Sequence, residues 1–234
     1  PLYHAAPMRF CMQVMRLGGT VIIMEHFDAE QYLSLVQRYR ATHTQLVPTM
    51  FVRMLKLPEE VRHKYDTSTL NCAIHAAAPC PMPVKRAMID WWGPIFIDAY
   101  GATEVGTTCQ ITSAEWLENP GSVGRPIPPF SVIVLDDDGN EVPMGQPGEI
   151  AIKGPQVMAG YWQRPDDTAR VMTADGYLRT GDIGQVGEDG GLRLVDRKKD
   201  LIFVSGFNVY PHEVETVVAQ LEGVQACAAV AMPD

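Results

Sequence analysis

The sequence lacks the features by which membrane, zinc-binding and nucleic-acid-binding proteins are usually identified. No run of about eighteen apolar residues occurs, so no segment is expected to span a bilayer as a helix. Basic residues are scarce, 19 against 28 acidic ones, and the net charge of −9 disfavours nucleic acid as a partner. The five cysteines form no CxxC pair and the six histidines show no metal spacing. We therefore expect reduced thiols, no protein-held transition metal and a cytoplasmic protein.

The glycine-rich phosphate loop GxxxxGK[ST] is also absent, so any ATP site must be built in another way. What is present is an ordinary globular composition, with 46% hydrophobic and 20% charged residues. A chain of 234 residues can bury a sizeable core in one or two domains.

The first half of the sequence alternates predicted strands with predicted helices. Asp28 and Gln31 are spaced as at the start of a capped helix, and Pro83 suits the first turn of another. This alternation predicts parallel βαβ units with a site at the carboxyl ends of the strands. The loops Ala76–Pro79 and Tyr100–Glu104 both follow such ends and should share one edge of the sheet. The expected strands cover residues 20–24, 44–47, 70–75 and 95–99, and the expected helices begin near residues 28, 49 and 83.

The composition changes twice further along the chain. From Gly121, prolines and glycines become dense and short strands alternate with turns, which predicts a small distorted β-barrel or sheet. After Arg197 a strand–loop–helix–strand pattern begins. The expected elements are strands at 131–135 and 149–152, a hairpin around 187–191, a strand at 201–204, a loop at 205–210, a helix from residue 211 and a strand at 226–230.

The sequence therefore predicts an α/β fold class in three parts. Residues 1–120 would form the βαβ half of a large domain, and residues 121–197 its β-rich subdomain. Residues 198–234 would begin a small α+β C-terminal domain.

Five residues have the chemistry needed to hold a nucleotide. The Tyr100 ring could stack on a purine, the Thr103 hydroxyl could donate to a phosphate, and Glu104 could hold Mg²⁺. Asp182 could accept hydrogen bonds from a ribose diol, and Arg197, fifteen residues later, could add a donor. Each also has a common structural explanation, namely a buried strand-end tyrosine, a solvated glutamate, a turn aspartate or a surface salt bridge. Their joint order favours the nucleotide site.

Six sequence blocks, in their order and approximate spacing, resemble the adenylate-forming superfamily. This superfamily includes acyl-CoA synthetases, the adenylation domains of peptide synthetases and beetle luciferases. The resemblance runs over the whole chain, and its last block is especially similar to fatty acyl-CoA synthetases. The blocks are Pro1–His4, Ala76–Pro79, Tyr100–Glu104, Gly148–Gly154 with Gly160–Trp162, Tyr177–Asp182, and Asp196–Pro211.

The resemblance implies a two-step reaction. A carboxylate attacks the α-phosphorus of MgATP to give an acyl-adenylate and pyrophosphate, and the thiol of coenzyme A then displaces AMP. The implied cofactors are ATP, Mg²⁺ and coenzyme A, and the implied partner is a small-molecule carboxylate rather than nucleic acid. A peripheral membrane contact and a homodimer are left open.

The resemblance also assigns roles to individual residues. Thr103, Glu104 and Lys199 are the implied catalytic residues, with Lys199 at the hinge before the small domain. Gly206 would lie in a loop brought to the pantetheine tunnel. The implied nucleotide contacts are Ala77 and Ala78 in the adenine loop, Tyr100 on adenine, Thr103 on phosphate, Glu104 on Mg²⁺, and Asp182 with Arg197 on the ribose.

The acyl group is implied to lie beside His4, Ala76, Gly101 and Ala102. Gly101 stands where short-chain relatives carry tryptophan, which disfavours acetate and favours a medium- or long-chain fatty acid. Aryl and other cyclic acids stay open. Two further cations, Lys153 and Lys198, are interpreted as surface charges.

The resemblance also has two gaps, one at each end of the chain. The family's phosphate loop precedes the first block, and its catalytic lysine lies beyond the last residue of this sequence. We therefore expect a fragment that catalyses adenylation poorly by itself. Three alternatives stay open: a peptide-synthetase adenylation domain that loads a carrier protein, a luciferase-like oxidase, and an inactive truncated nucleotide-binding protein.

Overall fold

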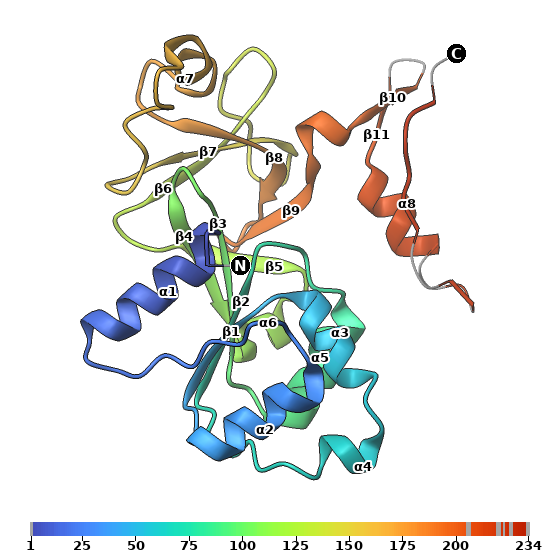
Figure 1. Cartoon of the computed structure of the whole chain (residues 1–234). Helices are drawn as coiled ribbons and strands as arrows, with labels where there is room; N and C mark the ends of the chain where they lie inside the picture. The colour runs from blue at the N-terminus through green and yellow to red at the C-terminus, as the bar shows by residue number, and fades with distance from the viewer. Residues whose placement is uncertain (1, 205–206, 219–220, 222, 225–226, 233–234) are drawn as a thin grey trace. The chain divides into compact units, whose positions relative to one another are not determined.

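The computed structural model describes residues 2–204, 207–218, 221, 223–224 and 227–232. The chain forms two compact units (Figure 1), of which unit 1 spans Pro1–Gly124 and unit 2 spans Arg125–Asp234. The finer division into three parts stays a prediction.

Unit 1 contains a sheet in which parallel and antiparallel pairing meet. Strands β1, β2 and β3 are parallel neighbours, and β4 runs antiparallel to β3. Helices α3 (Pro48–Leu55) and α5 (Met82–Trp92) lie in the crossovers, which confirms the predicted βαβ units. The strands are β1 (His43–Leu46), β2 (Cys72–Ala76), β3 (Phe96–Ala102) and β4 (Gly106–Thr112).

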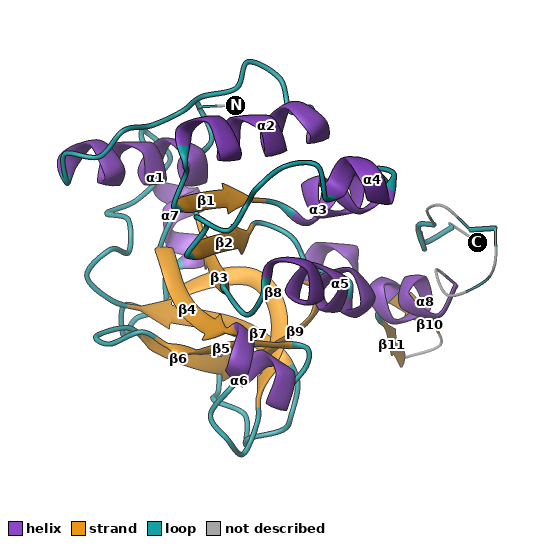
Figure 2. Ribbon diagram, turned by 90° about the horizontal axis from the view of Figure 1, so that it is seen from below, coloured by secondary structure: helices purple, strands orange, loops and turns teal. Residues whose placement is uncertain are grey.

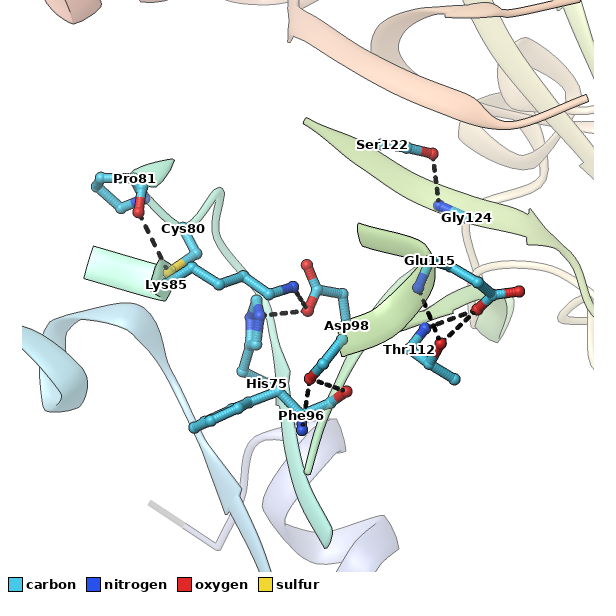
Figure 3. Close-up of polar contacts among 11 residues, drawn as sticks. His75, Cys80, Pro81, Lys85, Phe96, Asp98, Thr112, Glu115, Ser122 and Gly124 are labelled. Carbon is cyan, nitrogen blue, oxygen red and sulfur yellow. Dashed lines mark hydrogen bonds and ion pairs between the residues drawn. The ribbon is translucent and has the colours of Figure 1, made fainter. Parts of the chain in front are cut away.

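The other helices of unit 1 have local causes in the sequence. Asp28 Oδ1 accepts a 2.8 Å hydrogen bond from Gln31 N, which confirms the predicted start of α2 (Ala29–Tyr39). Thr112 and Glu115 form a capping box at α6 (Ser113–Glu118), which sequence reasoning missed (Figure 3). Two further helices are α1 (Ala5–Arg16) and α4 (Glu59–Arg62).

The core of unit 1 lies between the sheet and three of its helices. Figures 1 and 2 show α2, α3 and α5 grouped beside strands β1 and β2. Phe51 of α3 packs edge-on against Phe96 of β3, with ring centroids 5.5 Å apart. The core includes Leu33, Val36, Leu46, Phe51, Met54, Ala73, Met88, Phe96, Ile111 and Trp116.

Two predictions for unit 1 need correction. The strand expected at residues 20–24 is wrong: the segment has no regular structure, and its Ile23 is 58% exposed. An apolar run with no strand to pair with does not become part of a sheet. Strand β3 continues to Ala102 because β4 pairs with it, so Tyr100 lies inside the strand rather than in a loop.

Unit 2 is built on four antiparallel strands in the order β9-β8-β7-β6. The strands at 131–135 and 149–152 and the hairpin around 187–191 are confirmed. Of the predicted barrel or sheet, these strands form a sheet, because β6 and β9 stand at opposite ends of this order and do not pair with each other among the described residues. The elements are β6 (Ser131–Leu135), β7 (Gly148–Lys153), α7 (Pro165–Val171), β8 (Leu178–Val186) and β9 (Leu192–Arg197); β5 (Ser122–Pro126) lies at the boundary of the units.

Four short elements follow β9. The strand at 201–204 and the helix from Pro211 are confirmed, whereas part of the expected loop, residues 207–209, is a strand that pairs antiparallel with β10. The strand at 226–230 is wrong, because residues 227–230 have no regular structure. The elements are the 3₁₀ turn η1 (Lys198–Asp200), β10 (Ile202–Val204), β11 (Phe207–Val209) and α8 (Pro211–Val218). No helix in the described part of the chain is both long enough and apolar enough to cross a membrane.

Candidate functional site

The aspartate and arginine that the sequence singled out are cross-strand partners in unit 2. Asp182 on β8 is opposite Arg197 on β9, and Arg197 Nε lies 2.9 Å from Asp182 Oδ1. The hairpin turn at residues 187–191 brings them together. Asp182 is buried, with 9% of its surface exposed, whereas the Arg197 side chain is 60% exposed. The pair thus presents a fixed carboxylate beside a solvent-facing guanidinium.

A hollow of about 380 Å³ adjoins this pair. Its lining residues are Thr180, Gly181, Arg197, Lys198 and Lys199. Three of these five residues are cationic, so the hollow favours an anionic group. Gly181 has a φ of +73°, a left-handed conformation that side chains with a Cβ rarely adopt. The left-handed backbone of strand β8 at this point beside the hollow therefore favours glycine.

Lys198 lies at the surface, as the sequence interpretation has it, with its side chain 39% exposed, but it is anchored by two carboxylates. Its Nζ lies 3.2 Å from Asp137 Oδ1 and 3.1 Å from Glu149 Oε2. Arg179 also contacts Glu149 Oε2, at 3.2 Å. Partial burial alone would lower the pKa of Lys198, but the bonds to Glu149 and Asp137 outweigh it and raise that pKa.

Glu149 is the residue of this network that the sequence could have revealed. It directly precedes the apolar run Ile150–Ile152 in strand β7 and is 8% exposed. A carboxylate in an apolar run needs a cationic partner when the strand is buried.

Two predicted residues lie beyond this network. Lys199, the predicted hinge lysine, directly follows the anchored Lys198 in η1 and is exposed. Gly206, the predicted pantetheine-loop residue, lies outside the described residues.

In unit 1, the two loops expected to share one edge do so. Ala76 at the end of β2 is opposite Ala99 on β3, so the Ala77–Pro79 loop and the Thr103–Val105 turn leave the same end of the sheet. Ala77 has a φ of +75°. For alanine this left-handed conformation costs about 1–2 kcal/mol, so the loop is held by its surroundings.

The predicted nucleotide residues of unit 1 differ in exposure. Ala77, Ala78 and Thr103 are exposed, Glu104 is half-buried, and Tyr100 is only 7% exposed. A purine could therefore reach Tyr100 only over a small part of its ring in this conformation. The roles of these residues stay predictions.

Gly101 has a backbone reason to be glycine. A Cβ built there would lie 1.8 Å from the carbonyl oxygen of Gly106 on the facing strand. The pairing register also shifts between Tyr100 and Gly101, as at a β-bulge. Close approach of two backbones thus explains this glycine without an acyl pocket, and its predicted acyl contact stays a prediction, as does that of Ala102.

The remaining predicted residues concern the acyl group and the metal. His4 precedes α1, is exposed, and stacks on Tyr3 with ring centroids 4.8 Å apart. No cluster of three or more His, Cys, Asp or Glu side chains in the described residues could hold a metal ion. Mg²⁺ commonly takes one or two carboxylates and completes its shell with water and substrate phosphates. A single carboxylate such as Glu104 fits that kind of site.

The sequence profile of the family described as AMP-binding enzyme matches residues 1–162. A long-chain-fatty-acid–CoA ligase of Escherichia coli O6:H1 is 41% identical over the whole chain, which covers 41% of that protein. A feruloyl-CoA synthase of an Amycolatopsis species is 38% identical over the whole chain, which covers 47% of it. The chain therefore spans less than half the length of these relatives.

Solved structures give the same picture. The amide bond synthetase McbA from Marinactinospora thermotolerans matches the whole chain with a TM-score of 0.92 and 34% identity, and 47% of its own chain is covered. The o-succinylbenzoate CoA synthetase of Bacillus subtilis, solved with its acyl-adenylate intermediate, matches with a TM-score of 0.89 and 27% identity, again with 47% covered. The fold described above is thus the fold of these proteins.

Proposed function

Because the chain belongs to the AMP-binding enzyme family, we propose that it serves an AMP-forming ligase that joins a carboxylic acid to coenzyme A. ATP and the acid would first give an acyl-adenylate and pyrophosphate. The coenzyme A thiol would then attack the acyl carbon, the bond to AMP would break, and a thioester would form. The names of the curated relatives, which are acid–CoA ligases, support this reaction class.

The observation that carries the proposal is the Asp182–Arg197 pair beside the cationic hollow. Asp182 is held by Arg197 in a fixed orientation, so its carboxylate can accept from ribose hydroxyls without first being ordered. The guanidinium carries five N–H donors, which allows it to bind Asp182 and a ligand together. Lys198 and Lys199 add positive charge where phosphate oxygens would lie.

Unit 1 has proposed nucleotide residues of its own. We propose that Ala77 and Ala78 border the adenine, Tyr100 stacks on it, and Thr103 donates to a phosphate. Glu104 would hold Mg²⁺, which screens phosphate charge when bound. Fatty acids are the proposed substrates, because the long-chain ligase of Escherichia coli is 41% identical to the chain; the feruloyl-CoA synthase, at 38%, makes aryl acids the second candidate. A cytoplasmic location, a homodimer and a peripheral membrane contact stay predictions.

The test measures AMP release by the native gene product with ATP, Mg²⁺, coenzyme A and an acid. Acetate, octanoate, palmitate and ferulate should be compared, and hydroxylamine should trap the adenylate. We expect release with palmitate or octanoate and little with acetate. Release with ferulate alone would favour an aryl acid, dependence on a carrier protein would favour a peptide-synthetase role, and light emission a luciferase-like one. No acid-dependent AMP release at all would refute the proposal.

Two variants connect the activity to the pair. R197A and D182N should each raise the KM for ATP about 10- to 100-fold, since each removes a charge-assisted hydrogen bond. R197A should also lower the free energy of unfolding by about 1–3 kcal/mol, because the Arg197 side chain is a partner of the buried Asp182 carboxylate, so the KM is measured well below the Tm. R170A is the matched control: the Arg170 side chain is 74% exposed and pairs with Asp167 in the same unit. It should leave the KM unchanged.

A further inference from the structure

A cluster of three buried titratable side chains lies beneath the Ala76–Pro79 loop. Lys85, Asp98 and His75 are 1%, 7% and 3% exposed. Lys85 Nζ donates to Asp98 Oδ1, and His75 Nε2 lies 2.5 Å from the same oxygen (Figure 3). The functional roles proposed above use none of these residues, which we call the buried cluster.

Strand periodicity explains how two of the three residues meet. On β2 the buried positions are Ala73 and His75, and on β3 they include Phe96 and Asp98. His75 and Asp98 are direct neighbours in the parallel register, so both point to the face that α3 and α5 cover. Phe51 of α3 packs edge-on against the His75 ring, with centroids 5.4 Å apart. An aspartate in this apolar face requires a cation.

Helix α5 supplies that cation. Lys85 lies in its first turn, where the backbone N–H of Lys85 donates to Pro81 O at 3.0 Å. Its ammonium is also 4.6 Å from the centre of the Trp116 ring. Burial lowers the pKa of Lys85, and Asp98 acts in the opposite direction. Removing either partner would leave an uncompensated charge in the core.

The three residues come from the elements that enter, leave and flank one loop. His75 directly precedes Ala76, Lys85 follows Pro81, and Asp98 lies two residues before Tyr100. The loop contains Ala77 with its φ of +75°, a shape that alanine would avoid roughly tenfold or more if the loop were unsupported. Such a conformation persists only where the surrounding structure determines it. Asp98 contacts His75, which precedes the loop, and Lys85, which follows it, and so connects the two ends of the loop.

We propose that the buried cluster holds the Ala76–Pro79 loop in its strained shape and thereby sets the affinity for the nucleotide. Lys85, Asp98 and His75 are positioning residues: they act through the loop. The loop part of this inference depends only on the fold, whereas the nucleotide part rests on the proposed function. If the loop has its binding-competent shape for only a fraction of the time, the affinity for the ligand is reduced in proportion to that fraction.

The decisive variant is K85M/D98N, because it removes both charges and so avoids the unpaired charge that either single change leaves. Thermal unfolding should show the single variants less stable than the double variant. In the double variant, amide exchange at Ala76 and Ala99, the last paired positions of β2 and β3 beside the loop, should become about tenfold faster; we call this rate loop exchange. The KM for ATP of the native gene product should rise about tenfold while kcat stays within about twofold. H75Q, which keeps the Lys85–Asp98 pair, should move both quantities in the same direction by less.

The matched control is K64M/E30Q, which removes an exposed pair 3.2 Å apart in the same unit. It should leave loop exchange and the KM unchanged. A77G added to K85M/D98N should recover most of the KM, since glycine adopts positive φ without the alanine penalty.

If K85M/D98N shows the same loop exchange and the same KM for ATP as the control K64M/E30Q, the proposal is overturned. It is also overturned if adding A77G to K85M/D98N does not recover the KM. If the gene product releases no AMP, the proposed function fails, and loop exchange alone decides whether the cluster holds the loop.

Discussion

Replacing Gly101 by alanine is expected to loosen the end of the β3–β4 hairpin. The added Cβ would lie 1.8 Å from Gly106 O and 3.0 Å from Thr107 Cα. Carbon and carbonyl oxygen normally stay about 3.3 Å or more apart, so the two backbones must separate by roughly 1.5 Å. The pairs Gly101–Thr107 and Ala102–Gly106 then lose their geometry. At about 1 kcal/mol for each lost hydrogen bond, plus overpacking, the cost is roughly 2–4 kcal/mol.

Urea unfolding followed by tryptophan fluorescence measures this cost. Trp91, Trp92 and Trp116 lie in unit 1, so the signal reports mainly on that unit. G18A is the control, because Gly18 has a φ of +76° and open space around it. Its cost should be only the left-handed penalty of about 1 kcal/mol.

The two explanations of Gly101 give opposite results. If close backbone approach is the reason for the glycine, G101A costs more than G18A. If the glycine only leaves room for an acyl chain, G101A unfolds like the unchanged protein and alters the preference among acids. A G101A cost at or below that of G18A would refute the backbone explanation.

Three further predictions follow from buried or anchored groups. Burial raises the pKa of the Cys109 thiol from 9.0 to about 12, so above pH 9.0 the folded state keeps a proton that the unfolded state loses. The free energy of unfolding should therefore fall above pH 9.0 by about 1.4 kcal/mol per pH unit. Urea unfolding at high pH measures this slope, and C109A should flatten it. E149Q should cost about 1–3 kcal/mol, because it removes the charge between two cations, and a Tm shift well above that of an exposed Glu188→Gln control would confirm it. D196A should speed amide exchange in the first turn of α8 without affecting α2, since Asp196 Oδ2 accepts from His212 N at 3.0 Å.

Sequence patterns correctly predicted those helices and strands that are determined by residues close to one another in the sequence. The start of α2 at Asp28, the helix α5 and the strand β6 follow from a cap, a proline and a run of β-branched residues, respectively. The segment 20–24 has the same apolar composition as a strand but lacks a partner, and pairing is not a local property. The capping box of α6 was visible as Thr112-Ser113-Ala114-Glu115 and could have been used.

The same distinction between local and non-local contacts applies to the functional residues. Asp182 and Arg197 were recognisable because they lie at the two ends of one hairpin, within fifteen residues. The buried cluster was not, since Lys85, Asp98 and His75 lie on three elements and each looks like a surface residue in isolation. Period-two burial along β3 was the signal that could have placed Asp98 on the apolar face.

The hairpin that joins β8 to β9 has a consequence for the order in which the molecule folds. Asp182 and Arg197 meet after one short chain closure, which hairpins complete within microseconds. The Ala76–Pro79 loop acquires its shape only after β2 and β3 pair in parallel across helix α5, a slower process because the contacts are less local. In a refolding chain, strands β8 and β9 around Asp182 and Arg197 should therefore be protected from exchange early, and the Ala76–Pro79 loop should be among the last parts of unit 1 to become ordered.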